Sequence, residues 1–283
     1  MEIIIGKTAG FCFGVSNAVN KTEELLKTQK NISCLGELVH NKQVTGDLIS
    51  KGLTIINNIE EAKQNVIIRA HGVTKETYDK AKELNLEVLD LTCPKVLKIH
   101  NIVEEYSNKG YYIFLIGQKE HPEVIGTISY CGKNAEIIEK KEEIHEKLKK
   151  FYDANINKLL ILAQTTFSIE KFNDIVTELK EELSNNEIEI KVKKTICDAT
   201  RLRQEETSKI AKKVDIMIII GGKNSSNTNK LYQISKQYCK NSILIETKDE
   251  LDIEHVKKFQ KIGIVAGAST SQKSIDSVVE MLN

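Results

Sequence analysis

Three cysteines of this 283-residue chain share one setting. Cys12, Cys93 and Cys197 each follow a strand-like apolar run and precede a charged, helix-like stretch. The residues 24 and 28 positions after them are, in order, Gly36, Gly117 and Gly221, then His40, His121 and Ser225. Thiolates bind iron and zinc, and no C-x-x-C pair is present. The repeated spacing therefore predicts three metal ligands supplied by distant parts of the chain.

Neutral polar residues accompany these cysteines at the ends of later strand-like runs. The segments VIIRAHG, LILAQTT and IVAGAST place a histidine, a threonine and a serine at equivalent positions. Hydroxyl and imidazole donors beside helix N-termini suit a phosphate group. The SSN segment at 225–227 also has the composition of a helix N-cap, a role that can coexist with anion binding. The expected phosphate donors are His40, His71, His121, Thr165, Ser225, Ser226, Asn227 and Ser269.

Glu123 is the one carboxylate within this spacing, two residues after His121. It is either an exposed residue in the first turn of a helix or, in a closed cavity beside a metal, a proton carrier in a relay that Thr165 and Thr166 extend. Two metal groups fit three cysteine ligands, zinc and a [4Fe–4S] cluster. Zinc takes three protein ligands and a water in catalytic sites, whereas a [4Fe–4S] cluster on three thiolates leaves one iron open to a substrate oxygen. Spacing does not separate them.

Short apolar runs alternate with charged amphipathic stretches along the chain, and this pattern indicates the strands and helices that position these residues. Such alternation is typical of βα units and parallel sheets. Expected strands are 2–5, 32–35, 65–70, 86–91, 111–117, 135–139, 159–164, 188–192, 215–222, 242–246 and 261–267. Ligands of open parallel sheets bind beyond the carboxyl ends of the strands, where the cysteines and polar donors fall.

The repeat predicts three similar α/β domains with mainly parallel sheets around a pseudo-threefold axis. The third unit ends in a helix without its last strand, and the N-terminal strand at 2–5 would supply it. The expected domains are 14–93, 94–193, and 194–283 together with 1–13.

Composition restricts the function classes. The net charge of +1, from 41 basic and 40 acidic residues, favours neither nucleic acid nor an anionic membrane. No apolar run approaches the ~20 residues that span a bilayer. Six widely spaced cysteines without an export signal indicate a reducing cytoplasm. We expect the residues outside the repeat to pack or lie at the surface: Cys34, Cys131 and Cys239 without a role, and His100, His145 and His255 at the surface.

Several motifs resemble those of the LytB/IspH family of 4-hydroxy-3-methylbut-2-enyl diphosphate reductases. They are AGFCFGV, GELVHN, RAHGV, LTCPKV, EHPEVIG, AQTT, TICDATRLRQ, GGKNSSNT and GAST, from about residue 5 to the C-terminus. The resemblance implies three α/β domains around one central [4Fe–4S] cluster held by Cys12, Cys93 and Cys197. It places Glu123 and Thr165 at the substrate hydroxyl and its proton relay, and the other polar donors named above at the diphosphate.

The implied reaction is the last step of the non-mevalonate isoprenoid pathway. Two electrons and two protons convert the allylic diphosphate to isopentenyl and dimethylallyl diphosphate plus water, with the substrate hydroxyl on the open iron and Glu123 as proton donor. The implied electron donor is a ferredoxin or a flavodoxin. Two other classes stay open on the residues: a zinc-dependent hydrolase of a phosphorylated small molecule, with Glu123 as base, and a non-catalytic sensor of a diphosphate or a cluster.

Overall fold

The computed structural model describes residues 1–184 and 187–283. Its strands are β1 (Glu2–Ile5), β2 (Ile32–Leu35), β3 (Thr54–Ile56), β4 (Asn65–Ile68), β5 (Glu87–Asp90), β6 (Tyr112–Ile116), β7 (Ala135–Ile138), β8 (Lys158–Ala163), β9 (Glu189–Lys193), β10 (Ile216–Ile220), β11 (Ser242–Ile245) and β12 (Lys261–Ala266). Its α-helices are α1 (Phe13–Thr28), α2 (Lys42–Ser50), α3 (Lys75–Glu83), α4 (Pro94–Asn108), α5 (Pro122–Ile128), α6 (Ile144–Asp153), α7 (Ile169–Glu182), α8 (Asp198–Ala211), α9 (Ser226–Tyr238), α10 (Ile253–Val256) and α11 (Gln272–Leu282). Short 3₁₀ turns are η1 (Ile59–Glu61), η2 (Lys141–Glu143) and η3 (Lys248–Glu250).

The strands form three sheets that share one topology. Their orders are β3-β2-β4-β5, β7-β6-β8-β9 and, read from the matching edge, β11-β10-β12-β1. Pairing is parallel, as between β6 and β8 and between β10 and β12. β1 fills the fourth place of the last sheet, with Glu2 opposite Lys261 and Ile5 opposite Ile264. The predicted parallel α/β architecture is therefore confirmed, as is the N-terminal strand that completes the third sheet.

Two compact units divide the chain. The first joins Met1–Ala70 to Asp198–Asn283, and the second is His71–Cys197. The first contains β10, β12 and the N-terminal strand, and the second contains the β7-β6-β8-β9 sheet. The finer domain boundaries expected from the repeat stay a prediction.

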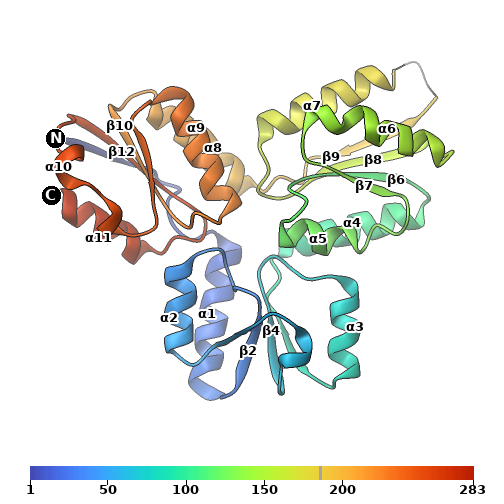
Figure 1. Ribbon diagram of the computed structural model, residues 1–283, viewed down its shortest axis with the longest axis horizontal. Coiled ribbons are helices and arrows are strands. Elements are labelled where there is room, and N and C mark those ends of the chain that lie inside the picture. The colour runs from blue at the N-terminus through green and yellow to red at the C-terminus, as the bar shows by residue number, and fades with distance from the viewer. Residues whose placement is uncertain (185–186) are drawn as a thin grey trace. The chain divides into compact units, whose positions relative to one another are not determined.

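Within the second unit, helices cover both faces of the β7-β6-β8-β9 sheet (Figure 1). Alternate side chains of β6 explain this. Phe114 and Ile116 pack with residues of α6 and α7, while Ile113 and Leu115 pack with residues of α4 and α5. A strand buried on both faces is apolar throughout, because successive side chains point to opposite faces. This rigid sheet positions the loops at its carboxyl edge.

In the first unit, helices likewise lie on both faces of the sheet that contains β10 (Figure 1). Ile216, Ile218 and Ile220 pack on the α10 and α11 side, whereas Met217 and Ile219 pack against α8 and α9. All five residues of β10 are buried. The strand run is therefore fixed on both faces, and the loops that follow β10 and β12 start from a rigid base.

One strand and one histidine differ from expectation. β3 was not predicted because only three residues, TII, form it. His100 was expected at the surface, which is wrong: its side chain is 2% exposed and its ring stacks on Tyr130 with centroids 4.4 Å apart. It shares the buried face of α4 with Val96 and Val103. Burial lowers the pKa of His100 to about 4, so the ring is neutral at pH 7.

The three cysteines outside the repeat are packing residues, as expected. Cys34, Cys131 and Cys239 are at most 5% exposed. Burial raises the pKa of both Cys34 and Cys131 to about 12, which keeps these thiols protonated. Protonated, enclosed sulfurs are poor metal ligands. Among the described residues, no helix is long and apolar enough to cross a bilayer.

Candidate functional site

Cys12 sits at the start of α1 in the first unit. It is the N-cap residue, yet its sulfur makes no capping hydrogen bond. Its amide donates to the Ala268 carbonyl oxygen at 3.0 Å, which joins it to the loop after β12. The side chain is only partly buried. The hydrogen bond fixes the backbone of Cys12, and its sulfur lies at the N-terminus of α1 without a capping bond.

The other two repeat cysteines belong to the second unit. Cys93 is the N-cap of α4, with Pro94 in the first turn, and Cys197 directly precedes α8. Both are partly buried. A helix N-terminus presents N–H groups and the positive end of the helix dipole, which favour a negatively charged thiolate or cluster. Their setting is the opposite of that of the three enclosed cysteines, so the donor set fits a thiolate-bound metal group.

The predicted metal ligands are divided between the two units. In the part of the chain that the structure describes, no three His, Cys, Asp or Glu side chains are grouped as a metal site. That the three cysteines bind one metal group therefore stays a prediction.

Two hydrogen bonds join Glu123 and Thr165, which are both predicted site residues. Glu123 is 2% exposed, so the interpretation as an exposed helix residue is wrong. Its Oε1 accepts from the Thr165 backbone N–H at 2.6 Å, and its Oε2 accepts from Thr165 Oγ1 at 2.6 Å. Burial raises the pKa of Glu123 to about 7, while both bonds from Thr165 act to lower it. The carboxyl group can therefore carry a proton near neutral pH.

Thr165 also contacts the cysteine that ends the second unit. Its carbonyl oxygen accepts from the Cys197 N–H at 3.0 Å. Glu123, Thr165 and Cys197 are thus connected by consecutive hydrogen bonds. This connection places a buried titratable group and one candidate metal ligand on either side of a single threonine.

Two histidines of the predicted phosphate-binding set, His71 and His121, lie beside each other in the second unit. The rings of His71 and His121 meet edge to face, with centroids 5.6 Å apart. His121 Nδ1 accepts from the Glu123 backbone N–H at 3.1 Å. An accepting Nδ1 carries no proton, so the neutral ring holds its proton on Nε2. That nitrogen can then donate a hydrogen bond.

In the first unit, the loop after β2 meets the loops after β10 and β12. Ser269 Oγ donates to the His40 carbonyl oxygen at 3.1 Å. A Cβ on Gly222 would lie 2.5 Å from that same oxygen, so only glycine allows the loop after β10 to approach so closely. Burial lowers the pKa of His40, and the nearby Glu37 acts in the opposite direction. His40 and Ser269 are therefore held against the loop that leads to Ser225.

The SSN segment forms the helix N-cap expected of it, while its anion-binding role stays a prediction. Ser225 is the N-cap of α9, accepting from the Thr228 N–H at 3.4 Å. Ser226 begins the helix, and Asn227 follows it with 4% of its surface exposed. Neither side-chain atom of Asn227 has a hydrogen-bond partner among the described residues. Buried amides are normally bonded, so the unpartnered Asn227 amide is able to bind a ligand.

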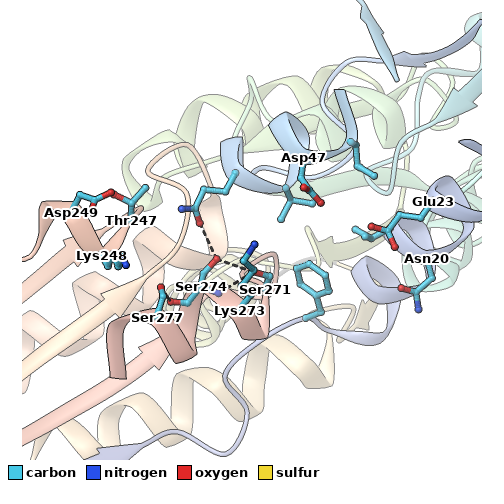
Figure 2. A pocket seen from close by; sticks show the side chains of 15 residues that line it. Asn20, Glu23, Asp47, Thr247, Lys248, Asp249, Ser271, Lys273, Ser274 and Ser277 are labelled. Carbon is cyan, nitrogen blue, oxygen red and sulfur yellow. Dashed lines mark hydrogen bonds between the residues drawn. The ribbon is translucent and has the colours of Figure 1, made fainter. Parts of the chain in front are cut away.

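A pocket of about 560 Å³ in the first unit contains none of the predicted site residues (Figure 2). Side chains of α1, α2, η3 and the start of α11 line it, together with Phe11. Ser274 Oγ donates to Gln43 Oε1 across one wall at 2.8 Å. Carboxylates such as Glu23 and lysines such as Lys273 are mixed in the lining, so the pocket selects no ligand charge.

Comparison with known proteins identifies the family. The family model described as LytB protein matches residues 3–283. The chain belongs to the LytB family.

Two relatives match this chain over nearly its whole length. The 4-hydroxy-3-methylbut-2-enyl diphosphate reductase of Clostridioides difficile is 44% identical, covering 100% of this chain and 99% of its own. That of Aquifex aeolicus is 42% identical over 98% and 94%.

Two solved structures are also similar. One, of (E)-4-hydroxy-3-methyl-but-2-enyl diphosphate reductase, has a TM-score of 0.71 at 41% identity over 100% of this chain and 99% of that one. The other, the E-1-hydroxy-2-methyl-but-2-enyl-4-diphosphate reductase of Plasmodium falciparum, has a TM-score of 0.90 at 31% identity over 99% and 87%. The fold of this LytB chain is therefore shared along its full length.

Some residues of the site were not identified from the sequence. Arg203 and Glu206 lie in a charged helical stretch and contact the loop before Cys12. Glu37 accepts from Asn224 Nδ2 at 3.0 Å and lies 3.7 Å from His40 Nδ1. The motifs TICDATRLRQ and GELVH contain Arg203 and Glu37, but charge alone does not distinguish a buried contact from a solvated helix face.

Replacing Asn41 by alanine is expected to destabilise the segment that carries His40. Asn41 is the buried N-cap of α2, and its Oδ1 accepts from the N–H groups of Gln43 at 3.0 Å and Val44 at 3.2 Å. Losing such a cap costs about 1 kcal/mol in the free energy of unfolding. Urea denaturation followed by circular dichroism measures it. Asn41→Asp keeps the acceptor and serves as the control; an alanine variant as stable as the unmodified protein would contradict the capping role.

Proposed function

We propose that this protein is a 4-hydroxy-3-methylbut-2-enyl diphosphate reductase. The reaction consumes two electrons and two protons, releases the allylic hydroxyl group as water, and yields isopentenyl and dimethylallyl diphosphate. Membership of the LytB family supports the proposal, with relatives of that name at 44% and 42% identity. The observation in this chain that carries it is the buried Glu123 carboxyl group, whose pKa of about 7 suits a proton donor.

Cys12, Cys93 and Cys197 would hold the metal group, which we propose to be one [4Fe–4S] cluster. Their partly buried sulfurs at helix N-termini support this assignment, because Fe–S clusters are held by thiolates. When bound, the cluster supplies the electrons of the reduction one at a time.

Neutral hydrogen-bond donors would hold the diphosphate. Asn227 supports this most directly, since its amide is buried without a partner among the described residues. The Nε2–H of His121 is a donor because Nδ1 accepts from the backbone. Donors fixed at helix N-termini hold an anion without reorganising. The proposed set is His40, His71, His121, Ser225, Ser226, Asn227 and Ser269.

Glu123 would donate the proton that lets the hydroxyl group leave as water. Both of its oxygens are bonded to Thr165, so the protonated carboxyl group is oriented before substrate arrives. Thr165 Oγ1 would contact the substrate hydroxyl group and pass the proton. A hydroxyl group can do this because it donates and accepts at once.

The electrons would come from a small redox protein, a ferredoxin or a flavodoxin. We propose the cytoplasm as the compartment, because the six cysteines are thiols rather than disulfides and a reducing environment preserves them.

Metal analysis and turnover of anaerobically purified protein test the proposal. We expect about four irons and four sulfides per chain, as for a [4Fe–4S] group, in a brown sample that converts the allylic diphosphate when reduced methyl viologen supplies electrons. Zinc without sulfide would overturn the cluster and favour the hydrolase. A cluster without reductive turnover would overturn the enzyme and favour a sensor.

A further inference from the structure

Arg203 is a buried cation outside the proposed catalytic set. It lies on α8, six residues after Cys197, and the residue is 5% exposed. Its Nη2 donates to the Gly10 carbonyl oxygen at 2.7 Å, and its Nη1 donates to the Ala199 carbonyl oxygen at 3.0 Å. The guanidinium group is charged at every physiological pH. Burying a charged group costs free energy unless the group is paired and hydrogen-bonded. The two carbonyl oxygens therefore stabilise the buried guanidinium group of Arg203.

The Gly10 carbonyl oxygen belongs to the loop that presents Cys12. Gly10 has φ +105°, a backbone conformation that residues other than glycine rarely adopt. Two residues later, the Cys12 amide is bonded to Ala268. Arg203 and Ala268 therefore hold the loop on either side of Phe11, which fixes the direction in which the Cys12 sulfur leaves the backbone.

Glu206, one turn beyond Arg203, holds the start of the same loop. Its Oε1 accepts from the Lys7 N–H at 2.8 Å, and its Oε2 accepts from the Thr8 N–H at 2.9 Å and from Thr8 Oγ1 at 2.5 Å. Burial acts to raise the pKa of Glu206, but these bonds and the charge of Arg203 outweigh it and hold the pKa below its usual range. The carboxylate is therefore engaged with the loop, and α8 grips residues 7–10 through both side chains.

We propose that Arg203 is a positioning residue for the Cys12 ligand and a fixed positive charge that favours the reduced state of the group bound there. The inference rests on the proposed iron–sulfur function. Hydrogen bonding and net charge around the ligands are principal determinants of the reduction potential of such a group. A positive charge stabilises the form that has gained an electron, so removing it shifts the midpoint potential to a more negative value.

Three substitutions separate the two contributions. Arg203→Met removes both the bond to Gly10 and the charge, Arg203→Gln keeps an N–H donor without the charge, and Arg203→Lys keeps the charge. Arg201→Met is the matched control, because Arg201 is two residues away on α8, 44% exposed, and paired with Glu205 and Asp198 at the surface.

Redox titration and electron paramagnetic resonance of the anaerobic holoprotein, with iron and sulfide analysis, are the measurements. We expect Arg203→Met and Arg203→Gln to shift the midpoint potential to more negative values, Arg203→Met also to change the resonance of the reduced group, and Arg203→Lys and Arg201→Met to match the unmodified protein. If Arg203→Met does not assemble the group, the comparison of Arg203→Gln with Arg203→Lys decides.

Equal potentials and identical spectra in all the assembled variants would overturn the inference and leave Arg203 with a structural role alone. The unmodified protein distinguishes this result from failure of the proposed function. If it assembles no iron–sulfur group, the proposed function fails together with the premise of this inference. If it assembles one and the Arg203 substitutions change neither the midpoint potential nor the spectrum, only this inference fails and the proposed function still holds.

Discussion

Replacing Cys12, Cys93 or Cys197 by alanine is expected to abolish assembly of the metal group and reductive turnover. A cluster with three thiolate ligands loses a third of its protein attachment in each variant, and alanine has no donor atom to replace the sulfur. Loss of an outer contact alone costs about 10–100-fold in metal-site affinity or activity, so loss of a ligand should exceed 100-fold. Iron and sulfide per chain, the visible spectrum and turnover are the measurements.

Cys34, Cys131 and Cys239 provide controls of identical chemistry. Each is buried, and burial raises the pKa of all three thiols. Replacing them by alanine should leave metal content and turnover intact, at a modest cost in stability from the small cavity. Full iron content in any of the three repeat-cysteine variants, or iron loss in a control, would contradict the ligand assignment.

Much of the architecture followed from the spacing of a few residues. The interval between each cysteine and the glycine and polar residue after it predicts one βα unit used three times. The shared strand orders of the three sheets bear this out, as does β1 beside β12. The spacing was informative because polar residues at the carboxyl ends of parallel strands are fixed in place by sheet geometry.

Side-chain burial on helices was harder to predict. His100 lies in KVLKIHNIVEEY, where charged neighbours suggested the surface, but the ring falls on the apolar stripe of α4. Arg203 is buried on α8 while Arg201, in the same TRLR segment, is exposed. A two-residue step on a helix turns about 200°, so neighbours of the same type face opposite environments. Only the tertiary partner, here the Gly10 carbonyl group, distinguishes them.

The Glu123–Thr165 pair shows the same limit at the proposed site. The spacing placed Glu123 near the metal ligands, yet both an exposed and an enclosed carboxylate fitted it. Burial and the two bonds from Thr165 required the structure, because the partners are 42 residues apart in the chain. The hydrogen bond between the Cys197 N–H and the Thr165 carbonyl oxygen was equally invisible, since backbone contacts leave no residue-type pattern.

Glu123→Gln is expected to keep the metal group and substrate binding while losing most turnover. Glutamine retains the shape of the side chain, its Oε1 can accept from the Thr165 N–H, and its Nε2 can donate to Thr165 Oγ1. The amide has no transferable proton at neutral pH. Positioned proton transfer contributes about 10²–10⁴-fold, so turnover should fall by at least about 100-fold. Glu120→Gln, an exposed neighbour in the same loop, should match the unmodified protein. Full activity of the Glu123 variant would eliminate the proton role.

The pH profile gives a second, independent readout of Glu123. Its pKa is raised from 4.5 to about 7, so the carboxyl group is protonated below about pH 7 and ionised above it. A proton donor works in its protonated form, and turnover of the unmodified protein should therefore decline as the pH rises through about 7. The residual turnover of Glu123→Gln should lack this decline.

The same raised pKa of Glu123 means that the folded protein binds this proton more tightly than the unfolded chain does. The stabilisation is fully present below pH 4.5 and is lost as the pH rises through about 7. The glutamine variant should lose that pH dependence of unfolding as well, and if both dependences persisted, the group titrating near pH 7 would be one other than Glu123.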